Sequence, residues 1–290
     1  MKTGKNKREL EIVVISDVHL GTFGCKANEL LAYLKSVSPK ILILNGDIID
    51  IWNFKKYYFP RSHLKIIKYI TTLLMNGTQV YYITGNHDEM LRKFKNFELG
   101  KLKIINKLEL DINGSKTWFF HGDVFDVTMK HSKWLAKLGG RGYDLLIIIN
   151  RIVNWFSSIL GYGKLSFSKK IKKSVKGIVS FINDFEQTIA EIAAMKNFDI
   201  VVCGHIHHPQ IKTITLNNNK SIKYLNSGDW VENMSSLEYD GSEWKIYKYV
   251  NFDQFSTSTI PLNEEIERVD FKKKKLFDEL LEELQIDISY

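Results

Sequence analysis

The sequence CGHIHHP, residues 203–209, is the stretch around which the rest of the chain is organised. The apolar run before it, residues 199–203, is rich in β-branched side chains and predicts a short buried strand. Gly204 lets the backbone bend, and His205 and His207 follow where the strand ends. Two imidazoles at this spacing on a loop can converge on neighbouring points, and imidazole is a common ligand for divalent transition metals. Most His-x-His pairs are ordinary structural or solvent-facing histidines, so the interpretation depends on the rest of the chain.

Polar side chains also follow four other apolar runs, at residues 11–16, 41–45, 79–84 and 117–120. These ends carry Asp17 with His19, Asp47, Asn86 with His87, and His121. Five of the eight histidines therefore stand at strand ends. Helical periodicity at residues 28–36 and 64–75 separates the strands. Strands that alternate with helices and end in polar residues predict an α/β protein with its site on one sheet edge.

Seven of these side chains are candidate metal ligands: Asp17, His19, Asp47, Asn86, His121, His205 and His207. Such a set is too large for one ion. It suits two divalent ions about 3.5–4 Å apart, with Asp47 bridging them. The mixture of nitrogen and oxygen ligands, without a thiolate, favours Mn²⁺, with Fe²⁺ or Zn²⁺ as alternatives.

The segment of residues 127–196 differs from the rest, and we expect it to form a helical insertion over the site. Residues 145–160 predict a helix with a very wide apolar face, and residues 171–192 carry one continuous apolar stripe. Between positions 129 and 177 there are eleven lysines or arginines and one acid, Asp144, in a chain whose net charge is +8. Positive charge beside a wide apolar helix suits an anionic membrane surface and an amphiphilic substrate better than a nucleic acid.

The remaining composition bounds the location and the domains. The N-terminus is polar, and no uninterrupted apolar run is long enough for a membrane span. Cys25 and Cys203 lie in unlike contexts, which fits a reducing compartment. We expect a cytoplasmic protein that is peripheral at the inner face of the membrane. We also expect one domain over residues 8–252 and a polar tail over residues 253–290.

The order of the blocks D-x-H, GD, GNHD, HGD and GHIH resembles the calcineurin-like metallophosphoesterases over residues 11–250. The resemblance implies a four-layer αββα sandwich, with two mixed sheets face to face and helices outside. It implies that one ion is held by Asp17, His19, Asp47 and His207, and the other by Asp47, Asn86, His121 and His205. It also implies in-line attack on phosphorus, with His87 as a proton donor or electrophile and Asp88 orienting its ring.

Three features resemble one branch of that family, the UDP-2,3-diacylglucosamine pyrophosphatases of lipid A synthesis. They are SDVHLG at the start, the insertion after HGD, and Gly228-Asp229-Trp230 after the histidine loop. This resemblance implies cleavage of a nucleotide-linked lipid to UMP and a lipid monophosphate. The best-known members carry arginine where this chain has His87. A soluble nucleotide or another phospholipid is therefore the alternative substrate. Nucleic-acid cleavage and a non-catalytic scaffold rank lower, and a scaffold would have no need of all seven ligands.

Four further residues are candidate substrate contacts: Arg92, Trp52, Lys169 and Lys173. Each has a plainer interpretation. Tryptophans pack in cores more often than they stack on ligands, and Arg92 could equally lie at an exposed helix start.

Overall fold

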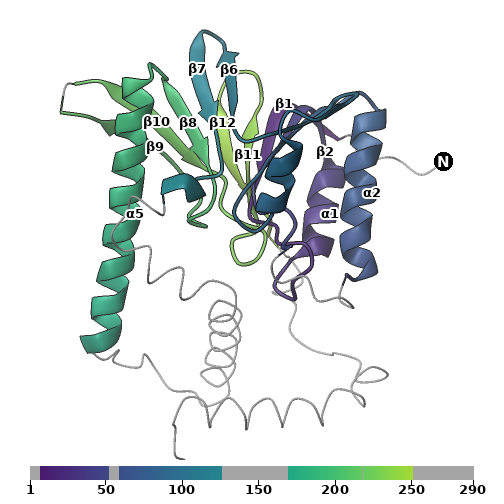
Figure 1. Ribbon diagram of the computed structural model, residues 1–290, viewed down its shortest axis with the longest axis horizontal. Helices are drawn as coiled ribbons and strands as arrows, with labels where there is room; N and C mark the ends of the chain where they lie inside the picture. Colours follow the sequence, from purple (N-terminus) through teal and green to yellow (C-terminus); the bar gives the residue numbers. More distant parts are fainter. Residues whose placement is uncertain (1–6, 52–58, 126–168, 218, 251–290) are drawn as a thin grey trace, which may run out of the picture. The chain divides into compact units, whose positions relative to one another are not determined.

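The computed structural model describes residues 7–51, 59–125, 169–217 and 219–250 (Figure 1). The chain divides into two units, Met1–Tyr249 and Val250–Tyr290, and every helix and strand below belongs to the first. The helix expected at residues 145–160 and the tail expected at residues 253–290 lie outside the described residues.

A seven-stranded mixed sheet has the strand order β12-β11-β1-β2-β3-β5-β4. Its strands are β1 (Arg8–Ile15), β2 (Val37–Asn45), β3 (Gln79–Ile83), β4 (Glu98–Leu99), β5 (Leu102–Ile105), β11 (Ser235–Tyr239) and β12 (Trp244–Lys248). The neighbours β1, β2 and β3 run parallel, so their carboxyl ends reach the same edge. Their apolar runs are buried on both faces, which is typical of parallel strands in the middle of a layered domain.

A five-stranded sheet has the order β6-β7-β8-β10-β9. Its strands are β6 (Leu108–Ile112), β7 (Ser115–Phe119), β8 (Ile200–Cys203), β9 (Gln210–Thr215) and β10 (Ser221–Asn226). Strand β8 is central, parallel to both β7 and β10. This parallel arrangement carries His121, after β7, to the same edge as the histidines after β8.

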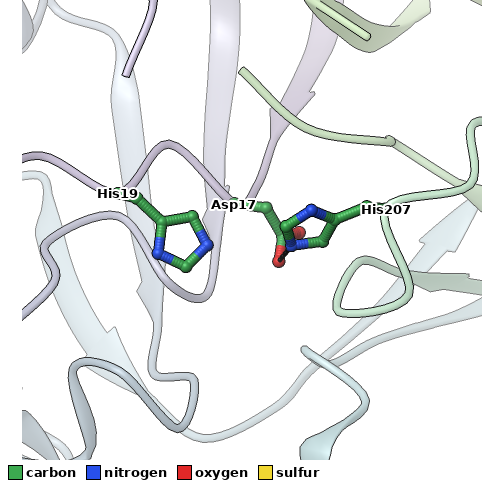
Figure 2. Close-up of side chains that lie close together, drawn as sticks. All are labelled: Asp17, His19 and His207. Atoms are coloured by element: carbon green, nitrogen blue, oxygen red, sulfur yellow. Dashed lines mark ion pairs between the residues drawn. The ribbon is translucent and has the colours of Figure 1, made fainter. Parts of the chain in front are cut away.

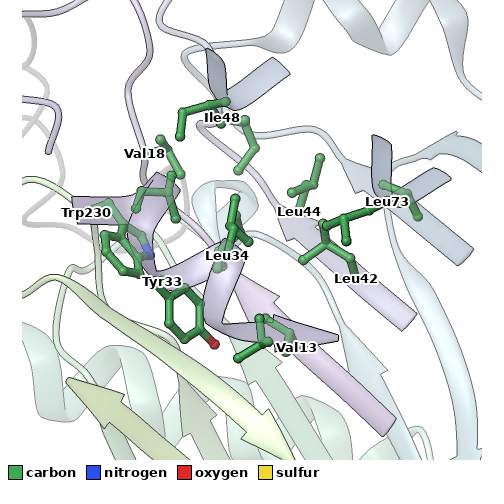
Figure 3. Close-up of a cluster of buried hydrophobic side chains, with 14 of the residues drawn as sticks. Val13, Val18, Tyr33, Leu34, Leu42, Leu44, Ile48, Leu73 and Trp230 are labelled. Atoms are coloured by element: carbon green, nitrogen blue, oxygen red, sulfur yellow. The ribbon is translucent and has the colours of Figure 1, made fainter. Parts of the chain in front are cut away.

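Helices cover the outer faces of both sheets. Helices α1 (Ala27–Ser36) and α2 (Arg61–Met75) pack on the first sheet, where Leu34, Leu42 and Leu73 share one apolar cluster (Figure 3). Helix α5 (Lys169–Met195) packs on the second sheet through a cluster that includes Phe185 and Tyr224.

The two sheets pack face to face. Ile12, Val14 and Ile43 of the first sheet share a buried cluster with Phe119 and Val202 of the second. The order of layers is therefore helix, sheet, sheet, helix, which confirms the predicted αββα sandwich. The last part of the segment predicted as an insertion, from Phe181 to Met195, belongs to the outer layer of this sandwich, since Phe185, Ile189 and Ala193 are buried in its core.

Four described strands were not predicted from the sequence: β4, β5, β6 and β9. All four lie toward the edges of their sheets, and β5 is only half-buried along its whole length. Their charged side chains interrupt the apolar runs on which strand prediction depends.

Two short 3₁₀ helices lie at the motifs. Helix η1 (Glu89–Phe94) directly follows GNHD, and η2 (Asp123–Phe125) begins at the aspartate of HGD. Within the described residues, no helix combines the length and the apolar character needed to cross a membrane.

Candidate metal centre

The carboxyl ends of strands from both sheets meet at one edge of the sandwich. The amide of Asn45, at the end of β2, donates to the carbonyl of Phe120 after β7, at 3.1 Å. The backbone N–H of His205, after β8, donates to Oδ2 of Asp17 after β1, at 3.0 Å. Because these hydrogen bonds cross from one sheet to the other, loops far apart in sequence form a single site.

Six of the seven predicted ligands lie in two clusters, and within each cluster the candidate ligand atoms lie within 4.8 Å of one another. The first cluster contains Asp17, His19 and His207 (Figure 2). The second contains Asp47, His121 and His205. The seventh, Asn86, has a buried side-chain oxygen that accepts no hydrogen bond.

The bonding of these atoms fits metal coordination. The Nδ1–H of His121 donates to the carbonyl of Asn45 at 2.9 Å, which leaves Nε2 as the atom that could bind an ion. Two buried ligand atoms, His19 Nε2 and Asn86 Oδ1, have no hydrogen-bond partner. Two others contact members of their own clusters instead: Asp17 Oδ1 lies 3.0 Å from His207 Nε2, and His121 Nε2 lies 3.2 Å from Asp47 Oδ2. A buried polar atom left unsatisfied costs about 1–3 kcal/mol, so the atoms of His19 and Asn86 call for a partner. Nitrogen and oxygen donors of this kind fit a divalent transition metal.

Backbone strain marks the same residues. Five of the candidate ligands adopt the left-handed region despite carrying a Cβ: Asp17 (φ 51°), His19 (54°), Asp47 (53°), His205 (67°) and His207 (52°). Such conformations cost about 1–3 kcal/mol each and persist only where the surroundings enforce them. Their concentration in one site indicates that the loops are held for function rather than for stability.

Two glycines at strand exits have no room for a side chain. A Cβ on Gly85 would lie 2.2 Å from Asp47 Oδ1, and one on Gly204 would lie 2.5 Å from Asp17 Oδ2. The glycines in GNHD and GHIH are therefore required because a ligand carboxylate occupies the adjacent space.

Carboxylates and imidazoles in this site shift each other's pKa values. Burial alone would raise the pKa of Asp17, but the imidazoles of His207 and His121 outweigh it and lower the pKa to about 2. Burial alone would lower the pKa of His207, but Asp17 raises it to about 9. The pKa of His121 is likewise raised well above its usual value, because Asp47 and Asp17 outweigh burial. Without an ion, the imidazoles keep protons beside the charged carboxylates, and a divalent cation would take the place of those protons.

His87 forms a third group of possible metal ligands with His19 and Asp50, and its ring contacts the Asp50 carboxylate. Its Nδ1 is 3.0 Å from Asp50 Oδ2, and its side chain is 21% exposed, so the ring reaches from the buried site to the surface. Burial would lower the pKa of His87, but Asp50 and then Asp47 raise it above its usual value. The same Asp50 oxygen lies 3.4 Å from Nδ1 of His19. Asp50 was not identified from the sequence, although its position three residues after Asp47, in GDIID, was a signal that it shares the loop.

The orienting role expected for Asp88 is wrong. Its carboxylate accepts hydrogen bonds from the N–H groups of Ile48 (3.0 Å) and Gly85 (2.6 Å) and from the hydroxyl of Tyr82 (2.6 Å). Asp88 therefore joins the loops after β2 and β3, while Asp50 contacts the His87 ring. Adjacency in sequence suggested Asp88, but successive side chains in this turn point to different sides.

The candidate substrate contacts have different outcomes. The Arg92 guanidinium donates to Asp123 Oδ2 at 2.5 Å and to the carbonyl of Gly85 at 3.3 Å, so it joins the GNHD loop to the HGD loop. Trp52 and the side chains of Lys169 and Lys173 lie outside the described residues.

A second support, also missed in the sequence, holds the histidine loop from the side of β11. The carboxylate of Asp229 accepts the backbone N–H groups of Val231 and Glu232 at 2.8 and 2.6 Å. In the turn that it closes, the amide of Asn233 donates to the carbonyl of His207 at 2.9 Å. The GDW motif thus shapes the turn that supports His207.

The sequence matches a protein-family model described as calcineurin-like phosphoesterase, over residues 10–209. Among curated proteins, it is 25% identical over 235 residues to the UDP-2,3-diacylglucosamine hydrolase of Wigglesworthia glossinidia brevipalpis. That match covers 79% of this chain and 90% of the relative. It is 24% identical over 253 residues to the protein of the same name from Porphyromonas gingivalis, which covers 80% of this chain and 95% of the relative.

Solved structures resemble the chain more distantly. An archaeal phosphodiesterase is 12% identical, with 82% of this chain and 98% of that chain covered and a TM-score of 0.37. A predicted phosphoesterase from Streptococcus pneumoniae is 16% identical, with 82% and 88% covered and a TM-score of 0.33. Scores at this level do not establish a common fold by themselves.

Proposed function

Because the chain belongs to the calcineurin-like phosphoesterase family and is a metal-dependent phosphoester hydrolase, we propose that it cleaves the diphosphate of UDP-2,3-diacylglucosamine. The products are UMP and a lipid monophosphate, as in lipid A synthesis. The observation that carries this choice is the match to curated hydrolases of that name over about four-fifths of the chain, in a protein whose candidate ligands gather at one edge.

The two clusters support a proposal of two divalent ions at this edge. Asp17, His19 and His207 would hold one ion, and Asn86, His121 and His205 would hold the other, with Asp47 shared between them. Mn²⁺ is the expected metal, with Fe²⁺ or Zn²⁺ as alternatives. When bound, such ions supply Lewis acidity toward phosphoryl oxygens and lower the pKa of water.

The chain's own contribution to the reaction is centred on His87. Asp50 faces its Nδ1 and so holds the ring and its tautomer, which leaves Nε2 for the substrate. As the bond from phosphorus to the leaving oxygen breaks, the Nε2 proton passes to that oxygen. The raised pKa of His87 keeps this proton in place near neutral pH, as a general acid requires.

The location proposed for this reaction is the inner face of a membrane. Helix α5 begins at Lys169, inside the segment with eleven lysines or arginines and one acid. Basic residues near an anionic leaflet add about 1 kcal/mol each to binding, and neighbouring apolar surface adds more. Lys169 and Lys173 would then contact the lipid phosphate or the surface.

The direct test supplies purified protein and Mn²⁺ with UDP-2,3-diacylglucosamine in mixed micelles, and separately with UDP-glucose and a simple phosphodiester. We expect UMP and a lipid monophosphate, identified by mass spectrometry, with turnover at least a hundredfold above that of UDP-glucose. Cleavage of the soluble substrates alone would overturn the lipid assignment.

A second candidate is hydrolysis of a soluble nucleotide or another phospholipid by the same centre. The observation that favours it is His87 itself, at a position where the best-known diacylglucosamine enzymes have arginine. Arginine clamps a diphosphate without giving a proton, whereas histidine can do both. The same substrate set distinguishes these candidates.

A further inference from the structure

Two consecutive residues of helix α5 contact the two ends of the histidine loop, residues 205–208. Phe185 and Glu186 are both buried, at 0% and 1% exposed. They lie on α5, which begins inside the basic segment of residues 129–177, and no step of the proposed reaction uses them.

Phe185 occupies the space behind the second cluster. Its ring centroid lies 6.3 Å from that of the His205 imidazole, at an interplanar angle of 38°. On the other side is Gly122, where a Cβ would lie 3.0 Å from Phe185 Cζ and 3.1 Å from His205 Cβ. Phe185, Gly122 and His205 are therefore packed without spare room. Gly122 directly follows His121, so the ring lies against the residue next to one candidate ligand and against the side chain of another.

Glu186 holds the other end of the loop. Its carboxylate pairs with the Lys212 ammonium of β9, and Nδ1 of His208 lies 3.9 Å from its Oε1. The same turn of α5 is thus anchored to β9, which fixes where Phe185 can sit relative to the loop.

The first cluster is held by other elements. The carbonyl of Asp17 accepts the N–H of Trp230 at 3.0 Å, and the carbonyl of His207 accepts the amide of Asn233 at 2.9 Å. The imidazole of His63 on α2 accepts the N–H of Gly21, two residues after His19. The first cluster is therefore supported by α2 and by the turn before β11, whereas α5 contacts the second. The direct link between the clusters is the N–H of His205, which donates to Asp17 Oδ2 at 3.0 Å.

We propose that α5, through Phe185, is the element that positions His205, and with it only the ion held by Asp47, His121 and His205. The left-handed conformation of His205, with a φ of 67°, is strained for a residue with a Cβ and persists where the surroundings enforce it. A smaller side chain at position 185 lets His205 relax away from the cluster, while the ion held by Asp17, His19 and His207 stays. Phe185 is a positioning residue, and this inference rests on the two-ion site of the proposed function.

The test compares Phe185→Leu with Phe181→Leu. Phe181 lies one turn earlier on α5, is also buried, and its ring contacts Phe185 at a centroid distance of 6.3 Å. Both variants lose the same atoms from the same helix. Mn²⁺ binding is measured by isothermal titration calorimetry, and the pairing of ions by electron paramagnetic resonance, with circular dichroism and thermal melting to verify folding.

The wild type and Phe181→Leu are expected to bind two ions and to show the spectrum of a coupled pair. Phe185→Leu is expected to bind one ion with unchanged affinity and the second at least tenfold more weakly, with loss of the coupled spectrum. Equal weakening of both ions, or two ions of wild-type affinity, would overturn the role of α5. Phe185→Met, a milder change, provides the same measurement if the leucine variant does not fold. A wild-type stoichiometry of one would instead contradict the two-ion site, so the two failures are distinguishable.

Discussion

His87 pairs with Asp50 through Nδ1, and its side chain is 21% exposed, close to the 22% of His207 in the first cluster. His121, in contrast, is buried, and its Nδ1–H donates to a backbone carbonyl. At the scale of single residues, the role proposed for His87, moving a proton rather than holding an ion, is decided by the metal content of the protein when His87 is replaced.

Replacing His87 with alanine is expected to reduce turnover by about 10²–10⁴, the usual loss for a general acid, while both ions are retained. The measurement pairs kcat with the metal content by elemental analysis. If metal were lost from this variant together with activity, His87 would be a ligand and not the proton donor.

Asp47→Ala is expected to have the opposite metal signature. Asp47 is buried, its Oδ2 lies 3.2 Å from Nε2 of His121, and its Oδ1 accepts the N–H of His87 at 2.8 Å. Its removal takes a carboxylate from the centre and breaks the hydrogen bond that holds the GNHD loop. We expect loss of activity and of most bound metal, while Asp184→Ala, at an exposed carboxylate on α5, keeps both. Two tightly held ions in Asp47→Ala, with near-normal turnover, would refute the assignment.

At the scale of elements, the strand exits are where packing and chemistry meet. The ligands follow strands directly, and the turns that expose them are too tight for a side chain at Gly85 and Gly204. The carboxylates of Asp47 and Asp17 can therefore occupy their positions only because Gly85 and Gly204 have no Cβ.

Gly85→Ala tests this dependence. Its Cβ would meet Asp47 at 2.2 Å from Oδ1 and 2.7 Å from the backbone nitrogen, so the carboxylate must move. We expect metal affinity to fall at least tenfold and the free energy of unfolding to fall by about 1–3 kcal/mol, as for other overpacked sites. Both are measurable, by calorimetric titration with Mn²⁺ and by urea unfolding.

Gly114→Ala is the matched control, because a Cβ there meets nothing within 4 Å although φ is 81°. It is expected to lose some stability through backbone strain and no metal affinity. A loss of affinity in the control, or unchanged affinity in Gly85→Ala, would show that crowding of Asp47 is not the cause.

For the whole molecule, the distribution of charge is the feature that distinguishes a lipid enzyme from an enzyme of soluble nucleotides. The net charge of +8 is more than accounted for by the segment at residues 129–177. In the proposed function, the basic residues at the start of α5 bind an anionic lipid surface.

Replacing Lys169, Lys170, Lys172, Lys173 and Lys176 with glutamine is expected to impair binding to anionic vesicles and turnover of the lipid substrate, while hydrolysis of a small phosphodiester is spared. The control replaces five exposed lysines elsewhere: Lys35, Lys65, Lys68, Lys116 and Lys248. It removes the same charge from other faces and should leave vesicle binding largely intact. Equal loss on both substrates in the first variant would mean that this segment shapes the metal centre.

The fold and the candidate ligands could be predicted because their signals are local. An apolar β-branched run followed at once by Gly, Asp, Asn or His is visible within about ten residues, and its order along the chain matches a family. The strands β4, β5, β6 and β9 were not predicted because their partners, not their own periodicity, define them as strands.

What the sequence alone determined was the set of ligand types and their places at strand ends, since apolar periodicity and chain order dictate both. Only the tertiary structure decided which groups face each other: Asp50 rather than Asp88 on His87, and His207 on Asp17 at 3.0 Å. It also showed that Phe185 packs behind His205. These pairings join residues from different loops, and some join opposite sheets. They depend on how two sheets and α5 pack, and that packing is the sum of many apolar contacts between distant residues.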